Sequence, residues 1–205
     1  VTMGFSVQAA HFIGAKDFSK ARSVMRHGYA FGLCFALCFL LVTVLIAPYL
    51  PIWLRGGKDI QHDASTYFLI FSFIIPFHLL EVMSASMLKV SGDMRRPSLM
   101  AILMCVLDVI FNYFFIFPTH DITLLGLQVT VPGWGAGVAG AAFGSLLAFI
   151  AVALPLAYYA IFRSPILAWK LDVERFVWRW QYIWNAVKIG SPMALQYLLM
   201  NGAQL

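Results

Sequence analysis

Long apolar runs separated by short cationic gaps are the feature that most limits how this chain can fold. Four runs are complete, and at 19 to 26 residues each is long enough to cross about 30 Å of hydrocarbon as a helix. They are residues 29–47, 64–88, 98–117 and 137–162. Their polarity does not alternate as it does in the strands of a membrane barrel. The sequence therefore predicts an all-α membrane protein, a polytopic helix bundle.

The distribution of the fourteen Lys and Arg residues predicts the topology of that bundle. Twelve of them lie in the first, third and fifth gaps, and two lie in the second gap. Cationic loops stay on the cytoplasmic side of a membrane. We therefore expect the loops around Arg22, Arg95 and Arg175 to be cytoplasmic and those around Arg55 and Leu125 to be external. This pattern also accounts for the net charge of +5, so the expected partner is the bilayer of the inner (plasma) membrane and no nucleic acid.

Incomplete apolar runs stand at both ends of the chain. Residues 1–15 are typical of the end of a preceding span and residues 189–205 of the start of a following one. We therefore expect an internal piece of a longer protein. Between residues 163 and 188, a helix starting at Asp172 would place these residues on one apolar face: Val173, Phe176, Val177, Trp180, Trp184 and Val187. Such a helix, rich in Trp and Arg, is typical of a segment at the headgroup plane.

Asp108 is the strongest candidate for a functional residue within a span, because a charge inside a membrane is costly. It lies about 15 Å of helical rise from Ser98, near the midplane, and Asn112 follows one turn later on the same face. A carboxylate and an amide oxygen suit a hard monovalent cation or an exchangeable proton. The alternative is an acid that is hydrogen-bonded into helix packing. In either case the remaining partners must come from other helices.

Glu81 is the second acid within a span. It lies about two turns from the cytoplasmic end of its run, with His78 on the same face at i−3. Two roles stay open for it, a structural ion pair with Lys89 or Arg95 and a proton relay with His78.

Other patterns point to packing rather than chemistry. Pro76 and Pro155 lie within spans and are expected to kink them. Small residues from Gly140 to Gly144 would let two membrane helices approach closely. Alternating polarity over residues 122–131 predicts a small external hairpin. The sequence has none of the usual enzyme signatures, and its His residues do not cluster with acids at ligand spacing. We therefore expect no enzyme, no metal site and no cofactor.

The third gap, Met87-Leu-Lys-Val-Ser-Gly-Asp-Met-Arg-Arg-Pro97, resembles a loop of the multidrug and toxic compound extrusion (MATE) transporters. That loop is typically Leu-Arg-Gly-x-Gly-Asp-Thr-Arg-x-Pro. Gly92, Asp93, Arg95 and Pro97 match it, and Met94 replaces the usual Thr. Four further segments resemble the family in the same order along the chain: residues 8–15, 108–117, 137–145 and 189–196.

The resemblance implies a twelve-helix carrier of two lobes, of which this chain holds helices two to six and the start of seven. Residues 1–162 would form the amino-terminal lobe without its first helix, residues 163–188 the cytoplasmic lobe linker and residues 189–205 the start of the carboxy-terminal lobe. Such carriers exchange cationic or amphipathic drugs for Na⁺ or H⁺. By resemblance, the coupling-ion site includes Asp108, Asn112 and Ser145. The fifth helix of these carriers contributes two positions to the site, which correspond here to Asp108 and Asn112. This chain departs from the family in having the acid at the first position, which leaves open whether it uses Na⁺ or H⁺.

The leading hypothesis is thus a secondary active antiporter for drug-like molecules that works as a monomer by alternating access. The alternative is a flippase of lipid-linked oligosaccharides with a related fold. A flippase is expected to have Arg and Lys in its cavity to bind pyrophosphate, and none of the four predicted spans contains either residue.

Overall fold

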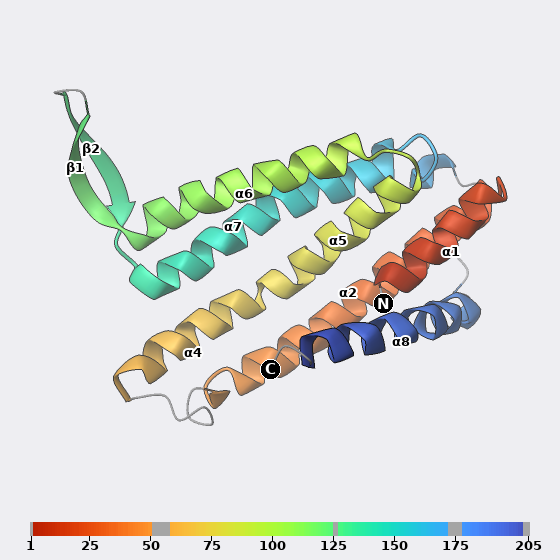
Figure 1. Ribbon diagram of the computed structural model, residues 1–205, viewed down its shortest axis with the longest axis horizontal. Helices are drawn as coiled ribbons and strands as arrows, with labels where there is room; N and C mark the ends of the chain where they lie inside the picture. The colour runs from red at the N-terminus through yellow and green to blue at the C-terminus, as the bar shows by residue number, and fades with distance from the viewer. Residues whose placement is uncertain (1, 51–57, 125–126, 172–177, 203–205) are drawn as a thin grey trace. The chain divides into compact units, whose positions relative to one another are not determined.

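The computed structural model describes residues 2–50, 58–124, 127–171 and 178–202. In these ranges helices follow one another along the chain, with one β-hairpin between α6 and α7 (Figure 1). The α-helices are α1 (Thr2–Gly14), α2 (Phe18–Ile46), α4 (Lys58–Ser72), α5 (Ile74–Val90), α6 (Arg95–Ile116), α7 (Gly137–Tyr158) and α8 (Trp180–Gly202). The hairpin consists of β1 (Pro118–Leu124) and β2 (Leu127–Trp134), and short helical turns, Tyr159–Arg163 and Trp169–Leu171, follow α7.

Four helical segments are long and apolar enough to cross a membrane. They are Phe18–Ile46, Gln61–Val90, Arg95–Ile116 and Gly137–Arg163. Each contains or closely overlaps one of the four predicted runs, so the polytopic helical fold is confirmed. The incomplete run at the amino-terminal end forms α1, as expected for the end of a span.

The chain divides into two compact units. Unit 1 consists of Val1–Phe35, Leu79–Ser98 and Leu154–Leu205, and unit 2 consists of Ala36–His78 and Leu99–Ala153. The three cation-rich gaps belong to unit 1, and the two cation-poor gaps belong to unit 2. This is the grouping that the predicted topology requires, because alternate gaps must lie on the same side of the membrane.

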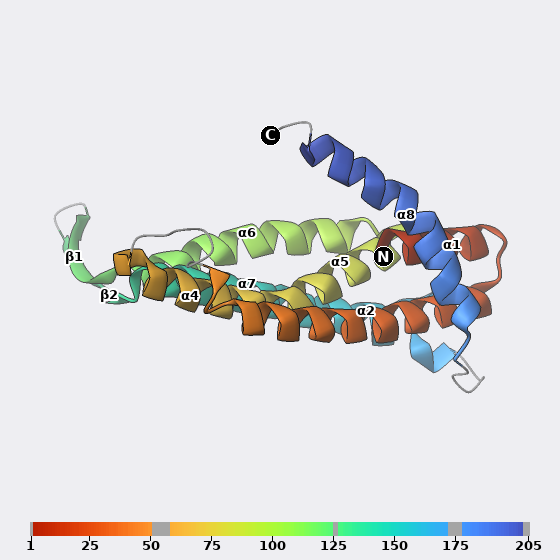
Figure 2. The same ribbon diagram turned by 90° about the horizontal axis from the view of Figure 1, so that it is seen from below.

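Unit 1 is held together by polar side chains that bond to distant segments. Gln8 of α1 donates to the Tyr182 carbonyl of α8 over 3.0 Å, where α8 crosses α1 (Figure 2). A Cβ atom at Gly4 would lie 2.0 Å from the Ala186 carbonyl oxygen, so only glycine allows this approach. Tyr29 of α2 is hydrogen-bonded to Ser84 of α5 over 2.7 Å, and both residues are buried.

His27 of α2 is fully buried and joins this helix to the segment before α8. Its Nε2 accepts a hydrogen bond from the Arg179 backbone N–H over 2.8 Å, and its Nδ1 lies 2.7 Å from the Ser23 carbonyl oxygen. These partners require a neutral imidazole with its proton on Nδ1. Trp178 and Tyr182 contact its ring, with centroids 5.3 and 5.2 Å away.

This contact corrects the predicted linker helix. Trp178 and Arg179 are not helical, and α8 begins only at Trp180, because the Arg179 N–H is directed to His27. Residues 172–177, where the helix was expected to start, lie outside the described residues. From Trp180 the helix runs unbroken past residue 188, so the division between linker and carboxy-terminal lobe stays a prediction.

In unit 2, α6 and α7 approach each other through glycine. A Cβ atom at Gly140 would lie 2.2 Å from the Phe115 carbonyl oxygen, and one at Gly144 would lie 2.9 Å from the Asn112 backbone nitrogen. The predicted close helix contact is thus confirmed. The predicted hairpin is also confirmed, with antiparallel strands that extend beyond residues 122–131 at both ends.

The two intramembrane prolines act differently. Pro76 has no N–H to offer the Ser72 carbonyl, and the helix is interrupted at Phe73, between α4 and α5. By contrast, α7 continues as an α-helix through Pro155 to Tyr158 and then widens into the π-helical turn Tyr159–Arg163. There the Ser164 N–H donates to the carbonyl of Tyr159, five residues earlier, over 2.9 Å.

Candidate functional site

Asp108 and Ser145 meet between α6 and α7 within unit 2. The Ser145 hydroxyl donates a hydrogen bond of 2.7 Å to Asp108 Oδ1, and both residues are half-buried. This approach depends on the glycines of α7, which bring the two helix backbones close together. The structure thus brings together the acid, which the residue pattern singled out, and the hydroxyl, which only the family resemblance supplied. We call Asp108 and Ser145 the acid–hydroxyl pair.

Asn112 lies one turn beyond Asp108 on α6 and is packed against α7. Its Oδ1 is buried and accepts no hydrogen bond from any described residue. A Cβ atom at Gly144 would lie 2.5 Å from this oxygen, so Gly144 makes the space that the amide occupies. A buried carbonyl oxygen without a donor costs about 1–3 kcal/mol, which makes Asn112 Oδ1 a ready acceptor for a proton donor or a cation.

Together, the three residues supply a carboxylate, a hydroxyl and an amide oxygen on two adjoining helices. Oxygen donors of this kind bind hard cations, and the carboxylate can also take up a proton. Cations bound by oxygen usually need more ligands than these three. No cluster of three or more His, Cys, Asp or Glu side chains occurs in the ranges that the structure describes.

Glu81 and His78 belong to different units. Glu81 is half-buried on the part of α5 that belongs to unit 1, whereas the acid–hydroxyl pair belongs to unit 2. His78 is exposed in unit 2, and its ring meets Phe149 of α7 edge-on with centroids 5.3 Å apart. A relay role for these two residues stays a prediction.

The residues of the third gap that match the MATE loop lie in a tight turn between α5 and α6. Gly92 adopts a positive φ of 93°, which favours glycine, and the Asp93 N–H then bonds back to the Leu88 carbonyl over 2.9 Å. Asp93 Oδ1 accepts from the Arg96 N–H over 3.3 Å and caps α6. Pro97 is buried in the first turn of α6, where the absence of an N–H costs nothing.

Arg96, which the sequence interpretation passed over in favour of Arg95, holds this turn in place. Its guanidinium pairs with Asp93 and lies over the Tyr159 ring, 4.1 Å from the centroid. Partial burial opposes ionisation of Asp93, but the hydrogen bonds and the charge of Arg96 outweigh it and lower the pKa of this carboxyl below its ordinary value. Only the folded positions of Arg96 and Tyr159 reveal this contact.

Comparison with known proteins identifies the family. The model of the MatE family matches residues 1–114, more than half of the chain. The chain belongs to the MatE family. A comparison with curated protein sequences found no match.

Solved structures of MATE proteins share the fold of this MatE chain at low sequence identity. An inward-facing multidrug resistance MATE family transporter matches with a TM-score of 0.77 and 20% identity, over 93% of this chain and 40% of its own. A MATE protein in complex with MaD3S matches with a TM-score of 0.82 and 21% identity, over 99% of this chain and 42% of its own. A MOP superfamily transporter from Pyrococcus furiosus matches with a TM-score of 0.80 and 21% identity, over 99% of this chain and 41% of its own. It is described as having a binding pocket of reverse polarity. The chain spans about two-fifths of these structures, which show a membrane transporter fold.

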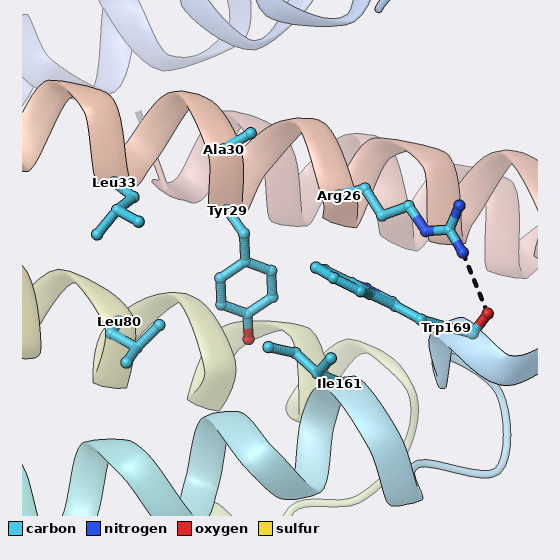
Figure 3. A pocket seen from close by; sticks show the side chains of 7 residues that line it. All are labelled: Arg26, Tyr29, Ala30, Leu33, Leu80, Ile161 and Trp169. Carbon is cyan, nitrogen blue, oxygen red and sulfur yellow. Dashed lines mark hydrogen bonds between the residues drawn. The ribbon is translucent and has the colours of Figure 1, made fainter. Parts of the chain in front are cut away.

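Unit 1 of this MatE chain also contains a cavity that the sequence did not predict. Its volume is about 610 Å³. It lies between α2, α5 and the segment after α7 (Figure 3), and we call it the Arg26 cavity. Arg26 lies at one end beside Trp169, and the remaining lining residues are Tyr29, Ala30, Leu33, Leu80 and Ile161.

Proposed function

We propose that this chain forms the amino-terminal lobe of a secondary active antiporter. By alternating access of two lobes, the complete carrier would export cationic or amphipathic drug-like molecules from the cell across the inner (plasma) membrane, in exchange for Na⁺ or H⁺. Membership of the MatE family and the shared transporter fold support this proposal. The observation that carries the coupling role is the hydrogen bond between Ser145 and Asp108 beside the buried Asn112 oxygen.

The chemistry of these three residues suits either ion. A cation at Asp108 would be met by the carboxylate and by a lone pair of the Ser145 hydroxyl oxygen, and by drawing on the carboxylate charge it would weaken the hydrogen bond that Ser145 donates. A proton on Asp108 would make the carboxyl a donor, with the Asn112 oxygen one turn away as a possible acceptor. In both cases ion binding changes the hydrogen bond between α6 and α7. Loading of the site is thereby linked to the packing of two helices.

The flippase alternative gains no support from this site. A lipid-linked oligosaccharide carries an anionic pyrophosphate, which an intramembrane carboxylate would repel. A hard monovalent cation or a proton is favoured there instead.

The test is Asp108→Asn in the full-length carrier reconstituted into proteoliposomes. An imposed Na⁺ or pH gradient should drive efflux of a fluorescent cationic dye by the wild-type protein and not by the variant. Asn keeps the size and can still accept from Ser145, so yield and thermal stability should remain close to wild type. Asp17→Asn is the matched control, because it neutralises a partly exposed acid in the α1–α2 loop, and it should retain efflux. Wild-type efflux by Asp108→Asn, with unchanged Na⁺ and pH dependence, would exclude the coupling role and make Glu81 the next candidate.

A further inference from the structure

We propose that the Arg26 cavity binds an anionic phospholipid of the cytoplasmic leaflet. The phosphate would lie at Arg26 and Trp169, and an acyl chain would extend along Leu33 and Leu80. This site lies within unit 1 and is separate from the acid–hydroxyl pair of unit 2. The inference therefore does not depend on ion coupling.

The shape of the cavity fits an amphiphile. Its volume of about 610 Å³ is within the usual range for sites that bind small molecules. Figure 3 shows Arg26 and Trp169 at one end and Leu33 and Leu80 at the other. Tyr29 points between them, but its hydroxyl is already bonded to Ser84. The cavity therefore has one cationic end and an otherwise largely apolar wall.

The depth of the cavity places these two ends at different levels of the bilayer. Twenty residues separate Arg26 from Ile46, the end of α2, which corresponds to about 30 Å of helix and to the thickness of the hydrocarbon core. With the cation-rich end cytoplasmic, Arg26 lies at the inner headgroup level. Leu33 lies about 10 Å deeper, among the acyl chains. The charged end thus faces headgroups and the apolar end faces lipid tails.

Arg26 and Trp169 have the chemistry to hold a phosphate. Arg26 donates through Nη2 to the Trp169 carbonyl over 3.1 Å, and its guanidinium lies 5.5 Å from the centre of the indole ring. A guanidinium has five N–H donors in a planar array that matches phosphate oxygens. In addition, Trp169 Nε1 is a buried donor for which no described residue provides an acceptor. In the proposed complex this N–H donates to a phosphate oxygen.

The sign of the charge separates this ligand from the proposed export substrates. A cationic drug would be repelled by Arg26, and the lining residues that the structure describes include no acid to attract it. Anionic lipids are enriched in the cytoplasmic leaflet, and basic pockets between membrane helices bind their headgroups. A bound lipid would join α2 to the segment after α7 and so stabilise unit 1.

The experiment uses the full-length carrier in nanodiscs that contain photoactivatable phosphatidylglycerol or phosphatidylcholine with identical acyl chains. After irradiation, labelled peptides are quantified by mass spectrometry. We expect phosphatidylglycerol to label peptides containing Leu33, Leu80 or Ile161 about fivefold more than phosphatidylcholine, the factor that corresponds to the ~1 kcal/mol contributed by one cation near the membrane surface.

Three variants separate headgroup from chain binding. Arg26→Gln should abolish the preference for phosphatidylglycerol, whereas Arg26→Lys should retain most of it. Leu33→Trp should reduce labelling by both lipids, because the larger side chain occupies the apolar end. Arg163→Gln is the matched control, since it removes an exposed cation from the same unit outside the cavity, and it should leave labelling unchanged.

Several outcomes would overturn the proposal. Equal labelling by the two lipids would remove the headgroup preference. A preference that persists in Arg26→Gln, or is lost equally in Arg163→Gln, would exclude Arg26 as its source. Displacement of the lipid label by a soluble cationic drug would identify the cavity as a substrate site instead.

Discussion

Units 1 and 2 bury their polar groups in different ways. In unit 1, His27, Gln8 and Tyr29 bond to Arg179, Tyr182 and Ser84, which lie between 55 and 174 residues away along the chain. In unit 2, the Ser145–Asp108 bond lies where glycines bring two helices into backbone contact, and the Asn112 oxygen beside it accepts no bond from a described residue.

If the coupling role proposed for Asp108 is right, this difference distinguishes contacts that stabilise the fold from residues that bind the coupling ion. The long-range bonds of His27, Gln8 and Tyr29 in unit 1 pair polar groups with one another and fix loops and helix ends, as expected for contacts that maintain a fold. In unit 2, an acid and an amide oxygen retain binding capacity inside the membrane, which is costly without a ligand. Substitutions in unit 1 should therefore reduce stability, whereas those around the acid–hydroxyl pair should chiefly affect ion coupling.

The first prediction tests whether the cation-rich and the cation-poor loops lie on opposite sides of the membrane. In full-length protein whose Cys34, Cys38 and Cys105 are replaced by Ser, His62→Cys should react with an impermeant thiol reagent on intact cells. Arg95→Cys should react only after the cells are opened. Both positions are exposed, so access to the reagent depends on topology. Labelling at position 95 on intact cells would overturn the topology.

Gly140→Ala should be the most destabilising substitution in unit 2. The new Cβ atom would lie 2.2 Å from the Phe115 carbonyl oxygen, so backbone must move and the α6–α7 contact must open. We expect a loss of more than about 3 kcal/mol in stability or failure to accumulate in the membrane. Gly14→Ala is the control, because a Cβ there meets no atom within 4 Å. Equal thermal stability of the two variants would contradict the close approach.

His27→Ala should produce the corresponding loss in unit 1. It removes a fully buried side chain and leaves the Arg179 N–H without its acceptor, at a cost of about 3 kcal/mol. His62→Ala is the matched control, because the His62 side chain is 92% exposed. Thermal unfolding of the purified carrier would measure both. The comparison between units fails if His27→Ala impairs coupling without lowering stability.

Features set by local pattern were predictable from the sequence. Apolar run lengths predicted the four spans, and the Gly140–Gly144 spacing predicted the close helix contact. Asp108 stood out because charge is rare within a span. Ser145 was found through the family resemblance alone, because a serine within a span carries little signal by itself.

Features set by tertiary contacts were not predictable. The pattern that favoured a helix from Asp172 could not show that Arg179 bonds to His27, 152 residues away along the chain. Likewise, the sequence shows Arg26 only as one of the cations of the first gap. Its position beside Trp169 depends on how the segment after α7 folds back.

Ser145→Ala should distinguish the contribution of this hydroxyl to helix packing from its contribution to ion coupling in unit 2. Loss of the hydroxyl removes one hydrogen bond to Asp108, which should cost about 1–2 kcal/mol in stability. We expect the apparent affinity for the coupling ion to fall about tenfold, because Asp108 would no longer be oriented from α7. Ser145→Thr keeps the hydroxyl and should retain near-normal coupling. Efflux measured against Na⁺ concentration and pH would show whether only Ala has this effect.

The smallest effect is expected at the Asp93–Arg96 ion pair, at the edge of unit 1. Asp93→Asn keeps the cap on α6 but removes the charge, and because Arg96 is half exposed the cost should stay below about 1 kcal/mol.

The lowered pKa of Asp93 means that its ionised form stabilises the folded state. This contribution is complete above the ordinary pKa of 3.8 and is lost as pH falls through the lower folded value. Wild type should therefore exceed Asp93→Asn in melting temperature at pH 7 and pH 5, and the two should converge below about pH 4. Asp17→Asn provides a parallel measurement in the α1–α2 loop, where Asp17 caps α2 and pairs with Lys20 in the same way. A gap between wild type and Asp93→Asn that widens on acidification would contradict this assignment.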